Sequence, residues 1–256
     1  MDRLEKIKKL NAHLSAEMPE VKIPDLPNDL ISQRKLLRAL MNIRPPMPLD
    51  EKFLKLQDEI LSAEVEERGI ITLADIPNVE KNIKLWQGDI TRLAVDAIVN
   101  AANSALLGCF VPLHNCIDNA IHSAAGLQLR DACQKIMRGS DEPTGRAKIT
   151  PAFNLPSKFV IHTVGPIIPP HRQQNSQEES QLAACYENCL ALAAKNNLKS
   201  VAFCCISTGE FHFPNQRAAE IAVDTVRKFL SKNNSVVVFN VFKDVDAQIY
   251  RKIFGK

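Results

Sequence analysis

The N-terminal part of the chain, residues 1–80, has apolar positions that recur every three or four residues, the spacing of an amphipathic helix. This pattern predicts helices over Asp29–Asn42 and Asp50–Arg68, and the region carries no strand signal. The segment Arg44–Pro48 between them contains three prolines, which interrupt a helix and favour an extended link. Gly69 suits the C-terminal cap of the second helix. Residues 1–80 are therefore expected to form a helical extension.

From Lys81 onward the pattern changes to short apolar runs that alternate with helical periodicity. Strands are expected at Ile83–Trp86, Val95–Val99, Phe159–Val164, Ser200–Ile206 and Ser235–Phe242. Helices are expected at Asp118–Met137, Gln181–Asn196 and Gln216–Ser231, and the polar stretch Gln173–Ser180 reads as a loop. This alternation predicts the α/β class, with parallel strands and crossover helices in a three-layer α/β/α sandwich over residues 81–256.

Composition and charge narrow the function classes. Lys plus Arg number 32 and Asp plus Glu number 29, so the net charge of +3 gives no reason to expect nucleic acid or an anionic membrane as a partner. No N-terminal segment resembles a signal peptide, and no run approaches the roughly 20 apolar residues of a membrane span. We therefore expect a cytosolic protein. In the cytosol, closely spaced Cys and His residues more often bind metal or perform chemistry than form disulfides.

Three polar loops follow predicted strands, at the edge where an open α/β sheet binds its ligands. The loop Ser207–Pro214 precedes a helix, and its small residues and backbone N–H groups suit a diphosphate. In Gly88–Thr91, the carboxylate of Asp89 can accept a hydrogen bond from an exocyclic amine such as that of adenine. In Asn100–Asn103, carboxamides can bond sugar hydroxyls. Each loop also has a plain interpretation as a strand-to-helix turn, an Asx turn or a helix cap.

Together these loops resemble the macrodomain family, because several motifs match in the family's order between Lys81 and the C-terminus. The motifs are Gly88-Asp89-Ile90-Thr91, Asn100-Ala101-Ala102-Asn103, Leu106-Leu107-Gly108, Ala120-Ile121-His122, Ala124-Ala125-Gly126, Thr144-Gly145-Arg146-Ala147-Lys148-Ile149-Thr150, Val160-Ile161-His162-Thr163-Val164-Gly165-Pro166 and Ser207-Thr208-Gly209. The resemblance implies a mixed, largely parallel sheet and an ADP-ribose cleft.

Within that cleft, the resemblance implies a place for each part of the ligand. Asp89 and Ile90 lie on the adenine side, and Asn103 lies near the distal ribose. The diphosphate lies against the backbone of Ser207, Thr208, Gly209, Glu210 and Phe211. The residues of this last loop also offer two aromatic rings, Phe211 and Phe213, either of which could cover a sugar.

The segment Gly108–Asp118 departs from the family pattern. Many macrodomains have a short run of glycines there that leads to a Val-Asp pair, whereas this segment is longer and contains Cys109, His114 and Cys116. Thiol and imidazole ligands suit zinc, and three protein ligands with an open fourth position are typical of catalytic zinc. Isolated Cys and His residues are also common as packed or surface side chains. The insertion resembles the zinc-containing branch of macrodomains, often accompanied by an N-terminal helical segment, and implies one Zn²⁺ per chain.

Members of that branch are encoded near sirtuin-type ADP-ribosyltransferases and lipoyl-carrier proteins. The resemblance therefore implies a zinc-dependent hydrolase that removes mono-ADP-ribose from modified protein side chains, through an ester-type linkage to Asp or Glu. The implied partners are an ADP-ribosylated protein, with a lipoyl carrier of the glycine-cleavage H type as a candidate, and a functionally linked sirtuin-type ADP-ribosyltransferase. Zinc would coordinate either a water or a substrate oxygen. Asn103 would orient the distal ribose; Asp118 would orient water or ligands, or only stabilise the first turn of the next helix.

Two other functions stay open from the sequence. A reader module would keep the cleft and bind ADP-ribose without turnover, and a deacetylase would act on O-acetyl-ADP-ribose. An open metal site favours an enzyme over a reader, because binding alone does not need one. The remaining Cys and His residues of the predicted elements are interpreted as core or structural side chains: Cys133, Cys185, Cys189, Cys204, Cys205, His122 and His162. His212 either contacts the ribose side of the ligand or faces water.

Overall fold

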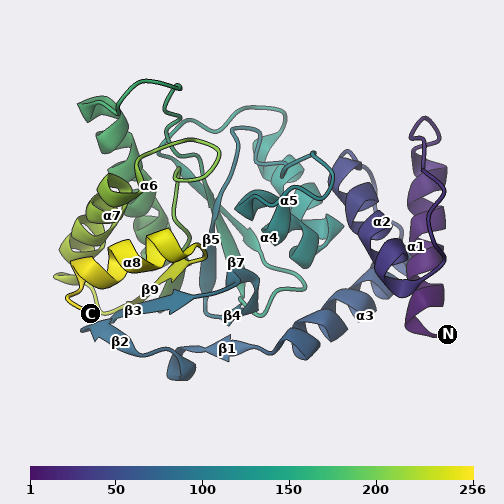
Figure 1. The fold of residues 1–256 in the computed structure, drawn as a ribbon, viewed down its shortest axis with the longest axis horizontal. Coiled ribbons are helices and arrows are strands. Elements are labelled where there is room, and N and C mark those ends of the chain that lie inside the picture. Colours follow the sequence, from purple (N-terminus) through teal and green to yellow (C-terminus); the bar gives the residue numbers. More distant parts are fainter.

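A computed structural model describes residues 1–256, and Figure 1 shows its helices and strands. The helices are α1 (Arg3–Glu17), α2 (Leu30–Ile43), α3 (Glu51–Arg68), α4 (Ile117–Ala125), α5 (Leu127–Met137), α6 (Ser176–Lys195), α7 (Asn215–Leu230) and α8 (Asp244–Ile253). The strands are β1 (Ile71–Thr72), β2 (Asn78–Glu80), β3 (Ile83–Gln87), β4 (Leu93–Ala94), β5 (Ala97–Ala101), β6 (Ala147–Pro151), β7 (Phe159–Thr163), β8 (Ser200–Phe203) and β9 (Val236–Val241). Two 3₁₀ helices span Leu73–Asp75 and Ile90–Arg92.

The main sheet is mixed and largely parallel. Its order is β2-β3-β9-β8-β5-β7-β6, with parallel pairing from β3 to β7 and antiparallel pairing of β2 and β6 at the two edges. Strands such as β8 and β9 are nearly continuous apolar runs because helices cover both faces of the sheet. In Figure 1, α4 and α5 lie on one side and α6, α7 and α8 on the other. The predicted three-layer α/β/α sandwich is confirmed, and no helix combines the length and apolar character that a membrane crossing requires.

Helices α1, α2 and α3 form a bundle beside α4 and α5 (Figure 1). Its apolar core has 11 buried residues, one of which is Leu127 of α5, whereas the sheet and its helices share a core of 47. Helices α2 and α3 correspond to the two predicted helices, and each begins after an Asp cap, Asp29 or Asp50. Gly69 caps the end of α3, as predicted, with a φ of 77°.

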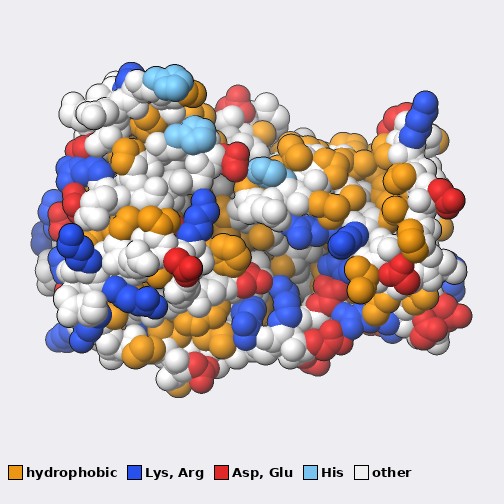
Figure 2. Space-filling view, in the orientation of Figure 1, with side chains coloured by type: hydrophobic (Ala, Val, Ile, Leu, Met, Phe, Trp, Pro, Cys, Tyr) orange, Lys and Arg blue, Asp and Glu red, His pale blue; other side chains and the backbone are white.

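A buried guanidinium joins this bundle to the rest of the chain. Arg130 of α5 is 3% exposed, and its Nη1 donates to the carbonyls of Met41 (2.8 Å) and Arg44 (2.5 Å) at the C-terminal end of α2. Its Nε donates to the carbonyl of Leu107 at 2.7 Å, in the loop that follows β5. Burial lowers the pKa of Arg130 to about 10, which leaves the group charged near neutral pH. Figure 2 shows further Lys and Arg side chains along this junction.

The single helix predicted over Asp118–Met137 is wrong, because Gly126 divides it into α4 and α5. Gly126 has a φ of 94° and a ψ of 174°, a conformation open essentially to glycine alone. Gln57 of α3 stabilises the break, since its Oε1 accepts a hydrogen bond from the backbone N–H of Leu127 at 2.9 Å. A contact from the N-terminal bundle therefore overrides a helical pattern that looks continuous in sequence.

Other differences from the predicted elements are smaller. Helices α1 and α8 and strand β6 are additional, and β1 and β2 contradict the absence of strand signals in residues 1–80. Helix α6 begins at Ser176 rather than after the expected Gln173–Ser180 loop, because Asn175 and Glu178 form a capping box. The cysteines predicted to be core residues are buried, except Cys205, which is partly exposed: Cys133, Cys185, Cys189 and Cys204.

Replacing Gly126 with Ala is expected to lower the free energy of unfolding by about 3 kcal/mol. The new residue would be strained at this backbone conformation, and its Cβ would lie 2.6 Å from Nε2 of Gln57. Gly139→Ala is the matched control, because Gly139 has a similar φ of 79° but no atom within 4 Å of an added Cβ. Urea denaturation followed by circular dichroism measures both variants, and equal losses would contradict the role of the Gly126 break.

Candidate active site and metal centre

The three loops singled out from the sequence lie at one edge of the sheet. Strands β3, β9, β8 and β5 run parallel, so their carboxyl ends point the same way. Asp89 follows β3, Asn103 follows β5, and the Ser207–Phe211 turn follows β8. The topology therefore brings together residues that are more than a hundred positions apart in the chain.

Asp89 stabilises the turn in which it lies. Its Oδ1 accepts hydrogen bonds from the backbone N–H (3.0 Å) and the hydroxyl (2.7 Å) of Thr91, which is the Asx turn allowed by the sequence. Its Oδ2 accepts from Nη1 of Arg68, in the last turn of α3, at 3.0 Å. The Asp89 side chain is 36% exposed, so its carboxylate remains accessible, whereas the neighbouring Ile90 is buried. Arg68 thus contacts this turn from α3, a contact that the sequence pattern did not reveal.

The Ser207–Phe211 turn is open where a ligand can approach the backbone. Ser207 has a φ of 64°, which is rare for a residue with a Cβ, and its buried hydroxyl has no hydrogen-bond partner within the protein. The hydroxyl of Thr208 donates to the carbonyl of Cys205 at 3.1 Å. No atom lies within 4 Å of a Cβ built on Gly209, so the backbone there is unobstructed. This geometry suits close approach of an anion to main-chain N–H groups.

The aromatic rings of this loop have different surroundings. Phe213 is 1% exposed and belongs to the main core, so the expectation that it covers a sugar is wrong. Phe211 is half-buried, and its carbonyl accepts a hydrogen bond from the backbone N–H of Ile168 at 2.8 Å. His212 and Glu210 are exposed at the tip of the turn. Only Phe211 of the two rings is left to contact a ligand.

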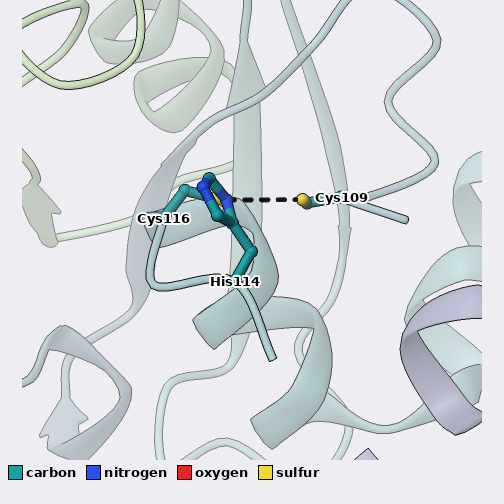
Figure 3. Close-up of side chains that lie close together, drawn as sticks. All are labelled: Cys109, His114 and Cys116. Atoms are coloured by element: carbon teal, nitrogen blue, oxygen red, sulfur yellow. Dashed lines mark hydrogen bonds between the residues drawn. The ribbon is translucent and has the colours of Figure 1, made fainter. Parts of the chain in front are cut away.

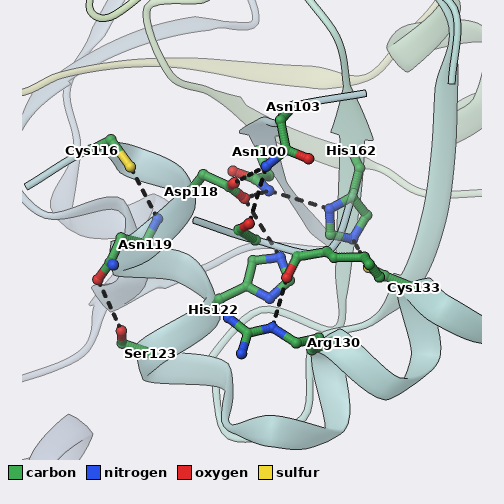
Figure 4. A network of polar contacts seen from close by, with 12 residues as sticks. Asn100, Asn103, Cys116, Asp118, Asn119, His122, Ser123, Arg130, Cys133 and His162 are labelled. Carbon is green, nitrogen blue, oxygen red and sulfur yellow. Dashed lines mark hydrogen bonds and ion pairs between the residues drawn. The ribbon is translucent and has the colours of Figure 1, made fainter. Parts of the chain in front are cut away.

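Asn103 and Asp118 meet beside the end of β5 (Figure 4). The Nδ2 group of Asn103 donates to the carbonyl of Gly108 (3.0 Å) and to Oδ2 of Asp118 (3.3 Å). The Nδ2 group of Asn100 donates to Oδ1 of Asp118 at 2.8 Å. The carbonyl oxygen of the Asn103 side chain is buried and has no partner in the protein. It is therefore an acceptor that the protein itself leaves unused.

Asp118 is buried, with 5% of its surface exposed, in the first turn of α4. Burial raises the pKa of Asp118 to about 6, while the hydrogen bond from Asn100 and the charge of Arg130 oppose the rise. The Nε2 atom of His122 lies 3.5 Å from Oδ1 of Asp118. The carboxylate thus faces Asn100, Asn103 and His122 rather than solvent, a geometry that suits orienting the two carboxamides.

Cys109, His114 and Cys116 converge in the loop that leads from β5 to α4 (Figure 3). The Sγ atom of Cys109 lies 3.6 Å from Nδ1 of His114, and the ligand atoms of all three side chains lie within 4.8 Å of one another. Cys116 is the N-cap of α4, and its Sγ accepts a hydrogen bond from the backbone N–H of Asn119 at 3.4 Å. Burial raises the pKa of Cys116 to about 12; the bond from Asn119 opposes the rise and the neighbouring Cys109 adds to it.

This donor set fits zinc. Thiolate and imidazole are ligands that zinc prefers, and bond lengths of about 2.3 and 2.1 Å around a tetrahedral ion separate a sulfur from a nitrogen by about 3.6 Å. A divalent cation would also neutralise the thiolate of Cys116, which burial otherwise disfavours. The three side chains are partly exposed, and on the open side Glu210 lies 3.8 Å from Nε2 of His114. The cluster therefore lies where a ligand in the neighbouring loops can reach it.

A second group of side chains, His122, Cys133 and His162, also brings ligand atoms within 4.8 Å of one another, but all three are buried. The Nε2 atom of His162 lies 2.9 Å from the hydroxyl of Thr150, and its Nδ1 atom lies 3.3 Å from Nδ2 of Asn100. Both ring nitrogens of His162 thus have partners inside the protein. This group matches the interpretation of His162 and Cys133 as core residues.

Comparison with known proteins identifies a matching family and a relative that is similar over nearly the whole chain. A family model described as Macro domain matches residues 99–222. A protein of Treponema medium named protein-ADP-ribose hydrolase is 51% identical over 251 residues, which cover 95% of this chain and 95% of the relative. The chain belongs to the macro domain family. The family expected from the ordered motifs is thereby confirmed.

Two further comparisons place this macrodomain among its relatives. The crystal structure of the Trypanosoma brucei macrodomain in complex with ADP-ribose superimposes with a TM-score of 0.66 at 28% identity, covering 84% of this chain and 94% of that one. A Fusarium oxysporum protein named probable bifunctional ADP-ribose hydrolase/ADP-ribosyltransferase is 41% identical over 247 residues, which span 88% of this chain and 41% of the relative. Because the Treponema match covers 95% of the chain, it includes the N-terminal bundle that lies outside the family model.

The stability of this macrodomain is expected to fall on acidification because of His162. Burial lowers the pKa of His162 to about 3, from a usual value of 6.5. Between these values the unfolded chain binds a proton that the folded chain does not, so the contribution is complete above about pH 6.5 and is lost as the pH falls toward about 3. His162→Gln should reduce the slope of the unfolding free energy against pH by up to about 1.4 kcal/mol per pH unit.

Urea denaturation at several pH values between about 4 and 7 measures this slope. His171→Gln is the control, because His171 is exposed. Identical slopes for wild type and His162→Gln would show that the buried imidazole does not govern the acid side of the stability curve.

Proposed function

We propose that this macrodomain is a zinc-dependent hydrolase that removes mono-ADP-ribose from modified protein side chains, and that it cleaves an ester-type linkage to Asp or Glu. The observation that carries the proposal is the position of the Cys109, His114 and Cys116 cluster directly beside Asn103. The Asn103 side chain donates to the carbonyl of Gly108, the residue before Cys109, at 3.0 Å. A metal centre there adjoins the loop that offers a free acceptor to a sugar. The name of the Treponema relative supports the hydrolytic reaction.

The three loops divide the recognition of ADP-ribose among them. Asp89 accepts a hydrogen bond from the adenine amine beside Ile90, and the backbone of Ser207, Thr208, Gly209, Glu210 and Phe211 holds the diphosphate. Asn103 accepts from a hydroxyl of the distal ribose through its side-chain oxygen, which has no partner in the protein. The support for this assignment is the open backbone at Gly209 together with the partnerless polar atoms of Ser207 and Asn103.

Hydrolysis adds water across the bond between the distal ribose and the acceptor carboxyl group, and it releases ADP-ribose and the free carboxylic acid. Cys109, His114 and Cys116 would hold zinc, which would supply Lewis-acid polarisation beside the scissile bond. Asn103 orients the ribose, and Asp118 fixes the Asn103 carboxamide by accepting from its Nδ2 group at 3.3 Å. Asp118 therefore acts through Asn103, in the positioning role that its burial favours.

The name of the Fusarium relative supports a proposal about the enzyme that produces the substrate. Its name joins an ADP-ribose hydrolase to an ADP-ribosyltransferase, which supports a functional link between this macrodomain and a transferase that attaches ADP-ribose to proteins. The sirtuin type of that transferase and a lipoyl-carrier protein as the substrate stay predictions from the family resemblance.

Removing one thiol of the cluster is expected to abolish both zinc binding and turnover. Purified wild type should contain about one zinc per chain, and Cys116→Ala should lose it together with at least about 100-fold of the rate at which ADP-ribose is released from a protein modified on carboxyl groups. Cys205→Ala is the matched control, because Cys205 is also a partly exposed thiol but lies outside the cluster. Metal content is measured by mass spectrometry, and release is measured by chromatography of free ADP-ribose.

Other outcomes of this experiment would favour different functions. Tight ADP-ribose binding with no release from any protein would make the chain a reader. Release of acetate from O-acetyl-ADP-ribose without release from protein would make it a deacetylase. Zinc in wild type with undiminished turnover in Cys116→Ala would restrict the metal to ordering the loop.

Substitutions at the two ends of the cleft should affect different kinetic constants. Asn103→Ala is expected to lower kcat by about 10- to 100-fold, with the dissociation constant of ADP-ribose changed less than about threefold, because the ribose is then bound but badly oriented. Asp89→Ala is expected to raise that dissociation constant about tenfold, because a charged acceptor is lost. Titration calorimetry and steady-state kinetics separate the two effects. Asn233→Ala, at an exposed carboxamide after α7, is the control; a reversal of the pattern would refute the assignment of the two ends.

A further inference from the structure

A buried side chain of the N-terminal bundle contacts the loop that carries the Cys109, His114 and Cys116 cluster. Asn42, in the last turn of α2, is 1% exposed. Its Oδ1 atom accepts a hydrogen bond from the backbone N–H of Leu113 at 3.0 Å, and its Nδ2 group donates to the hydroxyl of Ser123 on α4 at 3.0 Å. Asn42 therefore links the loop to the helix that begins directly after it.

The hydrogen bonds continue from Ser123 back to the same loop. The Ser123 hydroxyl donates to Oδ1 of Asn119 at 3.2 Å, and Nδ2 of Asn119 donates to the carbonyl of Val111 at 3.0 Å. The path thus leaves the loop at the N–H of Leu113 and returns at the carbonyl of Val111. Each of the three side chains both accepts and donates along it, so the direction of every bond is fixed by its neighbours.

Arg38, one turn before Asn42 on α2, adds a second connection. Its Nη2 group donates to the carbonyl of His114 at 3.0 Å and to Oδ1 of Asn119 at 2.8 Å. The backbone N–H of Asn119 in turn donates to Sγ of Cys116. Figure 4 shows Asn119 between Cys116 and Ser123. Two members of the cluster, His114 and Cys116, are therefore bonded to this network through a carbonyl and a sulfur atom.

Few contacts within this loop hold its shape: between Cys109 and Cys116, one backbone hydrogen bond runs from the N–H of His114 to the carbonyl of Val111, at 3.3 Å. It contains no helix or strand between β5 and α4. Leu113 has a φ of 57°, an unfavourable value for a branched side chain. Three apolar side chains of the loop remain largely exposed: Phe110 at 40%, Val111 at 56% and Leu113 at 40%. Burial of apolar surface therefore contributes little to the stability of this loop conformation. Side chains of α2 and α4 therefore supply most of the hydrogen bonds to its backbone, at Leu113, His114 and Val111.

We infer that α2 is a functional part of the metal centre, and that Asn42 and Arg38 are positioning residues that hold the cluster in the arrangement that binds zinc. This inference rests on the proposed zinc centre and adds to it the groups that set its affinity. Hydrogen bonds outside the ligand set typically change metal affinity by about 10- to 100-fold, because they fix the orientation of the ligands before the metal binds.

A role limited to attaching the bundle to the rest of the chain does not account for these contacts. Arg130 already bonds the end of α2 to the loop after β5, and Gln57 of α3 bonds the start of α5. Asn42 and Arg38 bond to α4 through Ser123 and Asn119. Each also bonds to a backbone group inside the segment between Cys109 and Cys116, at Leu113 and His114. These two bonds therefore hold the segment that carries the cluster.

The test measures zinc affinity by competition with a chromophoric chelator, using the full-length chain. Asn42→Ala and Arg38→Ala should each weaken zinc binding by about 10- to 100-fold, and the visible absorption bands of the Co²⁺-substituted protein should change. ADP-ribose affinity should stay within about threefold of wild type, because Asp89 and the Ser207–Phe211 turn are untouched. Asn42→Asp keeps the acceptor for the N–H of Leu113 and should lose less zinc affinity than Asn42→Ala.

Two control variants change polar contacts of α2 that do not reach the loop. Asn11→Ala removes hydrogen bonds from Nδ2 of Asn11 to Gln33 within the bundle, and Arg34→Ala removes an ion pair with Glu64 of α3. Both should bind zinc as tightly as wild type, even if thermal unfolding shows that they are less stable. Ser123→Ala interrupts the network from α4, removes the partner of the Asn42 Nδ2 group and leaves every residue of the bundle in place. It should resemble Asn42→Ala, so the inference can still be tested if an α2 variant does not fold.

The outcomes separate this inference from the proposed function. Wild type that binds zinc, with Asn42→Ala, Arg38→Ala and Ser123→Ala as tight as the controls, would overturn the inference and leave the zinc-dependent hydrolase standing. Wild type that binds neither zinc nor Co²⁺ would overturn both. Weakened binding in those three variants, with both controls unchanged, would establish α2 as part of the centre.

Discussion

A guanidinium buried as deeply as that of Arg130 needs hydrogen-bond acceptors, and the carbonyls that accept from its Nε and Nη1 groups belong to separate parts of the chain. Two carbonyls lie at the end of α2 and one lies in the loop after β5. Arg130 therefore holds the end of α2 in a fixed position relative to the sheet. The centroid of the Phe110 ring lies 4.3 Å from this guanidinium, so the same charge also contacts the start of the loop that carries Cys109, His114 and Cys116. With the end of α2 held there, Arg38 and Asn42 reach the backbone of that loop.

Much of the fold follows from local patterns. Helices α2 and α3 have a clear helical periodicity, an Asp cap each and, for α3, a capping glycine. The central strands have continuous apolar runs. These local signals fix the position of an element to within a few residues. The motifs around Asp89, Asn103 and Ser207 were identifiable because each follows a strand, and the parallel sheet then brings them together. The unusual Cys and His content of the loop indicated a metal, and the structure places those side chains within reach of one ion.

What the sequence did not reveal depends on contacts between distant residues. The break at Gly126 needs Gln57, 70 positions away from Leu127. The bonds from Asn42 and Arg38 to the loop span 71 and 76 residues. Asn and Arg on a helix surface are usually solvated, so only the packing of α2 against the loop distinguishes these two. The error at Phe213 has a similar cause, because the sequence alone does not distinguish an aromatic ring that contacts a ligand from one that packs in the core. The orientation of Asp118, inward toward two carboxamides, was likewise left open by its place in a first helical turn.

The closed path of hydrogen bonds from Leu113 to Val111 also has an evolutionary consequence. The recognisable family region begins at residue 99 and so contains the three thiol and imidazole side chains, but it excludes the helix that holds their loop. A recombination event that moved only this region into another protein would transfer Cys109, His114 and Cys116 and leave the support of their loop behind. Selection on the proposed metal centre would then act on both segments together, and the bundle and the domain would be inherited as one unit despite their separate hydrophobic cores.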